Sequence, residues 1–305
     1  MKNYKEKRIN FINNWPNGDP FLIEKRYLEL LNAYKKSNQT ALFKPLIMKV
    51  NDDEYYNKAI SFLIDSLEMM PQYPNFAFEF LFKAFDTFSK SRYEDDNITI
   101  RIKKVIDNIL INQISISSHL EIAINNLLKS MPSKTLQFLY IRLFQTIPNQ
   151  VYKRIITDQD NKINHHRKTI LDQIYAKYGC SYNNYSEGIR QGSRLLDKIF
   201  KQDSIILNDN TINILKEDKL HLLISGILYT MRNDMMHGNS MSPSKSSKAS
   251  LDVYKHSYFC FLATYYLLML IITDALYDND AAVLIKLSTS LNENLNNYIK
   301  LFNIK

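Results

Sequence analysis

The stretch that decides the fold runs from Tyr258 to Ile272 and reads YFCFLATYYLLMLII. It is about as apolar as a transmembrane helix, but it stops at Thr273-Asp274, short of the roughly 20 residues that cross a bilayer. It also carries three tyrosines, whose hydroxyls are costly in hydrocarbon. A helix that is apolar on every side is otherwise typical of a bundle centre or an oligomer interface. We therefore expect a central helix of a bundle and no membrane partner.

Helical periodicity continues on both sides of this segment. The first clear helix is predicted to open at Asp19-Pro20, with Asp19 as its N-cap, and Ile23, Tyr27, Leu30, Leu31 and Tyr34 form its apolar stripe. Further helices are predicted at 52–69, 74–90, 96–112, 117–130, 133–147, 160–178, 185–201, 218–237, from the region before Tyr258 to about Tyr277, and from Asp280 onward. Alternating strand patterns are lacking, and Gln202 to Glu217 reads as a polar stretch. The sequence predicts an all-α helical bundle.

The length of 305 residues predicts roughly two domains of about 150 residues each. A polar run near 148–165 interrupts the apolar periodicity and marks the expected boundary. We assign 1–150 to a helical module with a sensing, regulatory or dimerisation role, and 151–305 to a C-terminal domain packed against it. In the helix at 185–201, Gly188 and Gly192 are four residues apart and predict close approach of a neighbouring backbone.

Composition excludes several classes of enzyme. Only 6 glycines are present and they are scattered, whereas phosphate-binding loops and dinucleotide folds need clustered glycines. The 2 cysteines cannot form a zinc quartet or a disulfide framework. The N-terminal residues are too polar for a secretory signal, so a cytoplasmic location is expected. The net charge of +8 favours an anionic partner such as nucleic acid.

The most informative segment for function runs from Leu220 to Gly238 and reads LHLLISGILYTMRNDMMHG. Four residues separate Arg232 from His237 at the end of an apolar helix, and a polar residue, Asn233, directly follows the arginine. Gly238 is suited to the position after the helix C-cap. A structural interpretation is also open, because arginine and histidine both favour the negative end of the helix dipole.

This segment resembles the HEPN domain, whose ribonuclease motif is R-x-x-x-x-H with a polar residue after the arginine. The resemblance covers about residues 160–278. It implies a metal-independent endoribonuclease without a cofactor, active as a homodimer whose two motifs face a shared cleft. Members of this family often act as toxins or abortive-infection effectors that cut tRNA or other RNA, so an antitoxin or sensor protein is a possible partner. Asn239 replaces the tyrosine that partner enzymes modify in some members, and that route of regulation is not expected.

Residue types indicate how the motif would act. RNA cleavage without a metal needs proton transfer at the 2′-hydroxyl and the leaving 5′-oxygen, and histidines titrate near neutral pH. We assign proton transfer to His237 and transition-state charge to Arg232, which offers paired donors to phosphate oxygens. Asn233 would orient the phosphate or the arginine, and Asp234 would hold His237 or face solvent. The expected products are a 2′,3′-cyclic phosphate and a 5′-hydroxyl.

Helix geometry places a condition on this motif. Five residues turn about 500°, so Arg232 and His237 leave a regular helix about 140° apart. Either the last turn is distorted, or two copies of the helix approach each other across a two-fold axis.

Basic side chains that would contact RNA phosphates are Arg190, Arg194, Lys245 and Lys248. They would equally suit a solvated helix face and a solvated loop. His256 is either a second proton-transfer group or a partly exposed histidine. His165-His166 lacks metal-ligating partners at suitable spacing, and no metal site is expected.

Two acidic clusters, at 52–54 and 94–96, precede apolar runs and are interpreted as helix caps rather than as metal sites. The rival functions are a non-catalytic helical protein that binds other proteins, nucleotide or RNA, and a basic helical protein that binds DNA.

Overall fold

The structure is a computed structural model that describes residues 3–38, 41–93, 97–144, 149–179, 185–207, 210–238, 245–246 and 249–303. Its first half contains α1 (Asn3–Asn13), α2 (Leu22–Ser37), α3 (Glu54–Met69), α4 (Pro74–Arg92), α5 (Ile98–Lys104), the π-helix η1 (Val105–Leu110), α6 (Ile111–Ile116), α7 (Ser118–Lys129) and α8 (Ser133–Phe144). Its second half contains α9 (Gln150–Ile156), α10 (His165–Tyr178), α11 (Tyr185–Lys201), β1 (Ser204–Leu207), β2 (Asn210–Asn213), α12 (Lys216–His221), the π-helix η3 (Leu222–Leu228), α13 (Tyr229–Met236), α14 (Leu251–Tyr277) and α15 (Ala281–Phe302). The predicted all-α helical fold is confirmed.

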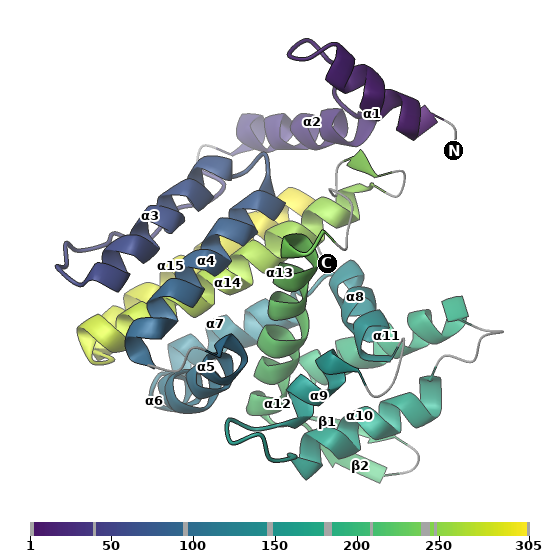
Figure 1. Cartoon of the computed structure of the whole chain (residues 1–305). Helices are drawn as coiled ribbons and strands as arrows, with labels where there is room; N and C mark the ends of the chain where they lie inside the picture. The colour runs from purple at the N-terminus through teal and green to yellow at the C-terminus, as the bar shows by residue number, and fades with distance from the viewer. Residues whose placement is uncertain are drawn as a thin grey trace.

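Helix α14 is the central element of the bundle. Figure 1 shows it running alongside α4 and α15, with α3 on the outer side of α4 and the helix formed by α12, η3 and α13 crossing them. Every residue from Tyr258 to Ile272 is buried. By length and composition α14 is sufficient to cross a membrane, but 83% of its most apolar window lies inside the molecule. The predicted central position of this segment is therefore confirmed.

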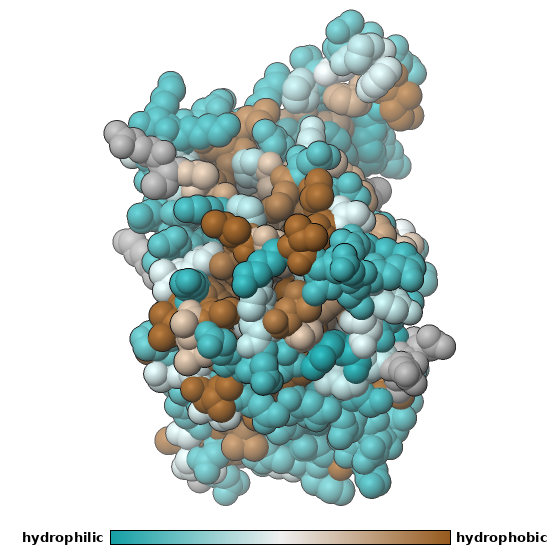
Figure 2. Space-filling view, turned by 90° about the vertical axis from the view of Figure 1, so that its left-hand side faces the viewer, coloured by the Kyte–Doolittle hydropathy of each residue, from teal (hydrophilic) through white to brown (hydrophobic). Residues whose placement is uncertain are grey.

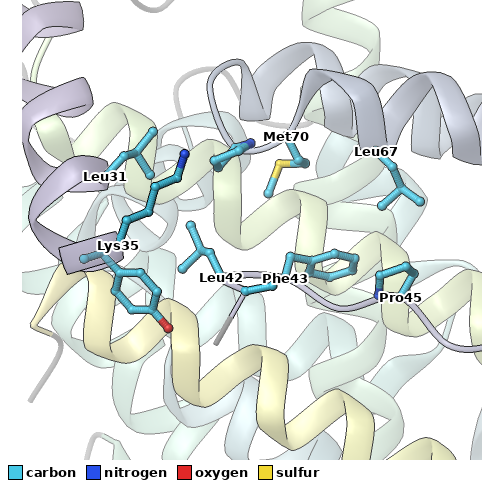
Figure 3. Close-up of a pocket in the computed structure, with 10 residues that line it drawn as sticks. Leu31, Lys35, Leu42, Phe43, Pro45, Leu67 and Met70 are labelled. Carbon is cyan, nitrogen blue, oxygen red and sulfur yellow. The ribbon is translucent and has the colours of Figure 1, made fainter. Parts of the chain in front are cut away.

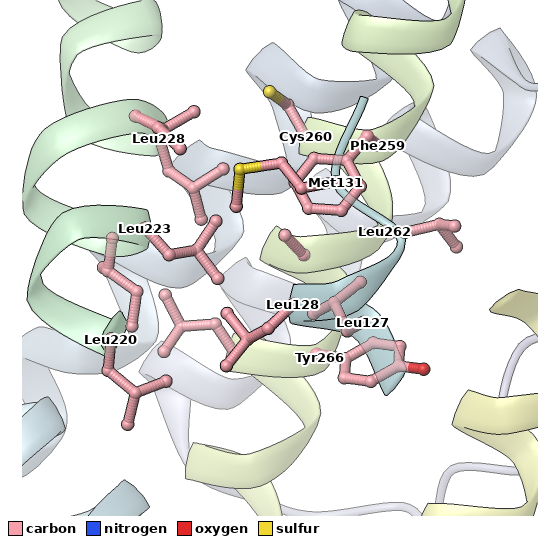
Figure 4. Packing of buried hydrophobic residues seen from close by; sticks show 14 of the residues in the cluster. Leu127, Leu128, Met131, Leu220, Leu223, Leu228, Phe259, Cys260, Leu262 and Tyr266 are labelled. Atoms are coloured by element: carbon pink, nitrogen blue, oxygen red, sulfur yellow. The ribbon is translucent and has the colours of Figure 1, made fainter. Parts of the chain in front are cut away.

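The two halves of the chain share one hydrophobic core. Figure 4 shows Leu127 and Leu128 of α7 facing Leu220 of α12 and Leu223 of η3, with Tyr266 of α14 among them. The same cluster of buried residues extends from α2 to α15. Burial of this apolar surface stabilises the halves together.

Several helix boundaries differ from those that the sequence predicted. The first predicted helix begins at Leu22 rather than at Asp19-Pro20, because Glu24 caps it by accepting a hydrogen bond from the Phe21 backbone N–H (2.8 Å). A separate helix, α1, precedes it and was not predicted. The helix predicted from residue 160 begins at His165 instead, since the Asn164 side chain caps it.

A short antiparallel hairpin occupies the stretch that the sequence suggested was only polar. Strands β1 and β2 pair with Ser204 opposite Asn213 and Leu207 opposite Asn210. Ile205 and Leu207 are buried while Ile206 is 75% exposed, so β1 does alternate. Four residues are too few for this alternation to stand out in the sequence.

Acidic residues at the N-cap position cap two of the described helices, α3 and α15. The Asp53 carboxylate accepts a hydrogen bond from the Tyr56 backbone N–H (2.6 Å), which confirms the interpretation of the cluster at 52–54. Asp280 caps α15 in the same way, through the Val283 N–H (3.0 Å). The cluster at 94–96 lies outside the described residues.

At Gly192 of α11 the close neighbour is a side chain, the ring of Tyr140 from α8, rather than the backbone that the sequence predicted. A Cβ at Gly192 would lie 1.9 Å from a ring carbon of this fully buried tyrosine. We expect Gly192→Ala to lower the free energy of unfolding by about 1–3 kcal/mol, because the core has no room for the added methyl. At the control position Gly188 the nearest atom lies at 3.2 Å. Urea denaturation that gave both alanine variants the same stability would contradict this packing.

One face of the molecule combines apolar and polar surface. Figure 2 shows apolar atoms gathered near the middle of this face, with hydrophilic atoms around them. Exposed apolar residues of the chain include Ile47 and Val50 between α2 and α3, and Ile64 on α3. Apolar atoms make up more than half of most protein surfaces, so exposed apolar residues do not by themselves indicate a binding site.

Candidate functional site

The motif residues lie at the end of the continuous helix formed by α12, η3 and α13. Arg154 of α9 holds the middle of this helix: its Nε donates to the Ser225 carbonyl (2.8 Å) and its Nη2 to Thr230 Oγ1 (2.5 Å). The same guanidinium lies 4.6 Å from the centre of the Tyr229 ring. Burial lowers the pKa of Arg154 to about 10, which leaves it charged at neutral pH. The helix therefore enters the motif in a fixed orientation.

The helix ends as the sequence predicted. His237 is the C-cap residue, and its backbone N–H still donates to the Asn233 carbonyl (3.0 Å), as in a regular helix. Gly238 adopts φ +62°, the left-handed conformation that favours glycine after a helix. Because the last turn is not unwound, the wide angle between the Arg232 and His237 side chains remains.

Arg232 and His237 are accessible but separate. Arg232 is half-buried, and its Nη1 donates to Asn233 Oδ1 (3.1 Å), so these two side chains are held together. His237 is exposed, and no described residue forms a hydrogen bond with its ring. No hydrogen bond joins Arg232 to His237, both of which the structure describes. One chain therefore presents the two groups to solvent without bringing them into contact.

Asp234 has a different position from either one that the sequence suggested. It neither holds His237 nor faces solvent: it is buried, and Arg142 Nη2 of α8 donates to its Oδ2 (2.5 Å). Burial raises the pKa of Asp234, although the Arg142 charge opposes that shift. Arg142 itself lies over the ring of Phe138, 5.6 Å from its centre. The turn of the helix directs Asp234 toward α8. The ion pair of Asp234 with Arg142 therefore fixes the motif to that helix.

The candidate RNA-binding residues fall into different environments. Arg190 is paired with Glu187 (Nε to Oε2, 2.7 Å), whereas Arg194 is exposed and no described carboxylate pairs with it. Lys245 forms an ion pair with Glu24 of α2 and lies 4.8 Å from the centre of the Phe21 ring. The predicted solvated position of Lys245 is therefore wrong, because the N-terminal helices hold it. Lys248 lies outside the described residues.

The Lys245 contact joins the segment after the motif to the N-terminal helices. Arg8 of α1 donates to the Lys245 carbonyl (3.0 Å), and the Phe11 ring lies 5.1 Å from Lys245 Nζ. A charge held between aromatic rings and a carboxylate is more stable than a solvated one. The N-terminal helices thus hold Lys245, eight residues after His237.

His256 lies inside the bundle rather than at the partly exposed position that the sequence suggested. Its Nδ1 is 2.8 Å from Thr135 Oγ1 of α8, and its ring contacts Phe138. Burial lowers the pKa of His256 to about 4, with a smaller contribution from Lys134. The ring is therefore neutral at pH 7 and does not reach solvent, which opposes a role in proton transfer.

The pKa of His256 predicts acid sensitivity. An unfolded chain protonates this histidine below about pH 6.5, but the folded protein does so only near pH 4. The contribution of the neutral His256 to the free energy of unfolding is therefore complete above pH 6.5. It decreases by about 3 kcal/mol in total as the pH falls to 4. We expect His256→Asn to lack this part of the pH dependence in urea denaturation between pH 7 and 4. His119→Asn, at an exposed histidine of α7, is the control, and parallel curves for wild type and His256→Asn would contradict the assignment.

One cluster of metal-ligating residue types was missed by the sequence reasoning. Asp107 of η1, Glu217 and His221 of α12 place one ligand atom each within 4.8 Å of one another, and His221 Nε2 is 3.2 Å from Asp107 Oδ1. The four-residue spacing of Glu217 and His221 was the available signal. Arg167 Nη1 donates to Glu217 Oε1 (2.5 Å), so a permanent cation already occupies that oxygen. We describe this cluster as a partly exposed polar network around the buried His221.

A pocket of about 340 Å³ lies between α2, residues 41–45 and the end of α3. Figure 3 shows Leu31, Leu42, Phe43 and Met70 around it, with Lys35 at its edge. Its lining residues all belong to the first 71 residues of the chain. It is therefore separate from the motif on α13.

Comparisons with known proteins give no match: no family profile, no curated protein and no solved structure matches this chain. The function proposed below depends on the motif and on the geometry described above.

Proposed function

We propose that this chain is a HEPN-type endoribonuclease that cleaves RNA without a metal and acts as a homodimer in the cytoplasm. The observation that carries the proposal is the exit of Arg232 and His237 into solvent from the end of one helix. That helix end is fixed by the ion pair of the buried Asp234 with the half-buried Arg142. A fixed position is required of groups that act on a transition state.

The chemistry follows from the two exposed groups. His237 would move the proton of the 2′-hydroxyl or donate one to the leaving 5′-oxygen, since an accessible imidazole performs both roles near neutral pH. Arg232, held by Asn233, would stabilise the negative charge on the phosphorus oxygens. Because one chain leaves these groups about 140° apart, a second copy is needed to complete the site.

The donor set of the motif supports a reaction without a metal. Carboxylates are the preferred ligands of the divalent cations that assist RNA cleavage. The one carboxylate of the motif, Asp234, is buried and forms an ion pair with Arg142. The accessible groups are therefore a guanidinium, an amide and an imidazole.

A toxin or anti-phage role is part of the proposal, with tRNA or another cellular RNA as the target and an antitoxin or sensor protein as the partner. The N-terminal helices hold Lys245, eight residues after His237. Through this contact, a change in the N-terminal helices would alter the position of Lys245, which is how the N-terminal module would sense or regulate.

The test of the reaction uses the purified full chain and total RNA in the presence of a chelator. We expect fragments with 2′,3′-cyclic phosphate and 5′-hydroxyl ends, because the 2′-oxygen is the nucleophile. A requirement for added divalent metal, or fragments with 5′-phosphate ends, would contradict the mechanism.

A non-catalytic RNA-binding protein is the second candidate. The separation of Arg232 and His237 within one chain favours this candidate, because each side chain would then bind a different RNA phosphate. In that case the same incubation would yield RNA binding but no fragments.

A further inference from the structure

A cavity of about 360 Å³ lies beside α8 and α11 and includes none of the motif residues. It is bordered by Ser133 at the start of α8, by Arg194 and Lys201 of α11, and by Lys255 of α14. Its volume is within the range of sites that hold small ligands.

The cavity carries positive charge that the described carboxylates do not neutralise. Lys201 is paired with Asp197 (2.8 Å), but no described carboxylate lies within ion-pair distance of Arg194 or Lys255. Glu187, two turns before Arg194, is paired with Arg190 and interacts with Arg194 only at longer range. The exposed Arg194 and the half-buried Lys255 therefore both line this cavity without a close carboxylate partner among the described residues, and such a site attracts anions.

The lining also contains apolar surface. Met131, Pro132 and Leu136 contribute to the cavity together with the cations. The first turn of α8, which starts at Ser133, borders it as well, and helix N-termini favour phosphate. Apolar surface next to arginine and lysine suits a nucleotide, whose base packs on the apolar part while its phosphate pairs with the cations.

We propose that this cavity binds one nucleotide of a single-stranded RNA, with Arg194 and Lys255 on its phosphate. The inference rests on the proposed ribonuclease function, for which it provides a substrate-binding subsite. Helix α8 connects the cavity to the motif: Ser133 borders the cavity, and Arg142 holds Asp234. The nine helical steps from Ser133 to Arg142 span about 14 Å, which equals about four nucleotides at the 3.4 Å spacing of a stacked strand.

The test measures binding without cleavage. The probe is a fluorescein-labelled 12-nucleotide RNA with 2′-O-methyl groups at every position, which removes the nucleophile. Fluorescence anisotropy gives its Kd for the full chain between 50 and 200 mM salt. We expect Arg194→Ala/Lys255→Ala to weaken binding at least about tenfold, since each lost contact is a charge-assisted hydrogen bond. The slope of log K against log salt should decrease in magnitude by about 0.7, the value for one neutralised phosphate of a single strand.

The control is Lys153→Ala/Lys286→Ala, which removes the same charge from exposed positions on α9 and α15. Unchanged affinity and salt slope in Arg194→Ala/Lys255→Ala would overturn the subsite and leave the nuclease proposal standing. A wild-type chain that does not bind the probe, or an equal loss of affinity for duplex DNA of the same length, would also overturn it. Probe binding that depends on Arg194 and Lys255 in a protein that cleaves no RNA would support the subsite and reject the nuclease.

Discussion

Replacing His237 with alanine is expected to lower the rate of RNA cleavage about 10²–10⁴-fold, the usual contribution of a positioned acid or base. Arg232→Ala should lower it about 10²–10³-fold, because a donor to the transition-state charge is lost. Both side chains reach solvent at the end of α13, so neither substitution should alter the fold. The measurement is the initial rate of fragment formation, with thermal denaturation as the check on folding.

Matched controls are His119→Ala on α7 and Arg26→Ala on α2, which remove exposed side chains of the same types. Mixing the Arg232→Ala and His237→Ala chains tests how the site is assembled. A site that takes its arginine from one copy and its histidine from the other recovers about a quarter of wild-type activity, since half of the dimers are mixed and each has one complete site. No recovery would show that each copy uses its own pair. Wild-type rates in both single variants would leave only the non-catalytic candidate.

Arg142→Met is expected to lower the free energy of unfolding by about 2–4 kcal/mol at pH 7, because it leaves the Asp234 carboxylate buried without its partner. Burial already raises the pKa of Asp234, and Arg142 opposes that shift, so the substitution raises this pKa further. A raised pKa means that the folded state disfavours the ionised carboxylate, which lowers the stability of the protein at pH 7. This loss of stability disappears as the pH falls and the carboxyl group is protonated. The loss measured by urea denaturation should therefore be smaller at pH 4 than at pH 7.

The double variant Arg142→Met/Asp234→Asn separates charge from packing. It should recover most of the stability lost in Arg142→Met at pH 7, because no charge then remains buried. A loss that is equal at pH 7 and pH 4, or that the second substitution does not reduce, would show that Arg142 contributes through its packing on Phe138.

The sequence was sufficient for the features that depend on neighbours a few residues apart. The apolar run from Tyr258 to Ile272 predicted the buried centre of the bundle, and Gly238 predicted the end of the motif helix. It was less reliable for helix starts, because several side chains compete to cap them: Glu24 and not Asp19 caps α2, and Asn164 caps α10. The hairpin at β1 and β2 was missed since its pattern is only four residues long.

The candidate site was predictable as a motif but not as an arrangement. Spacing alone identified Arg232 and His237 and predicted their separation around the helix. It could not place Asp234, whose partner Arg142 is 92 residues away, or Lys245, whose partner Glu24 is 221 residues away. His256 likewise became a buried neutral ring through contact with Thr135 of α8.

By itself, then, the sequence determined the helical class, the central apolar helix and the order of chemical groups at the end of α13. These follow from backbone hydrogen bonds and side-chain periodicity, which act within a few turns. The tertiary structure alone decided which charges are paired and which reach solvent: Asp234 and Lys245 are held by distant helices, while Arg232, His237 and Arg194 remain accessible. The physical reason is that burial and ion pairing depend on surfaces that meet only when the core forms.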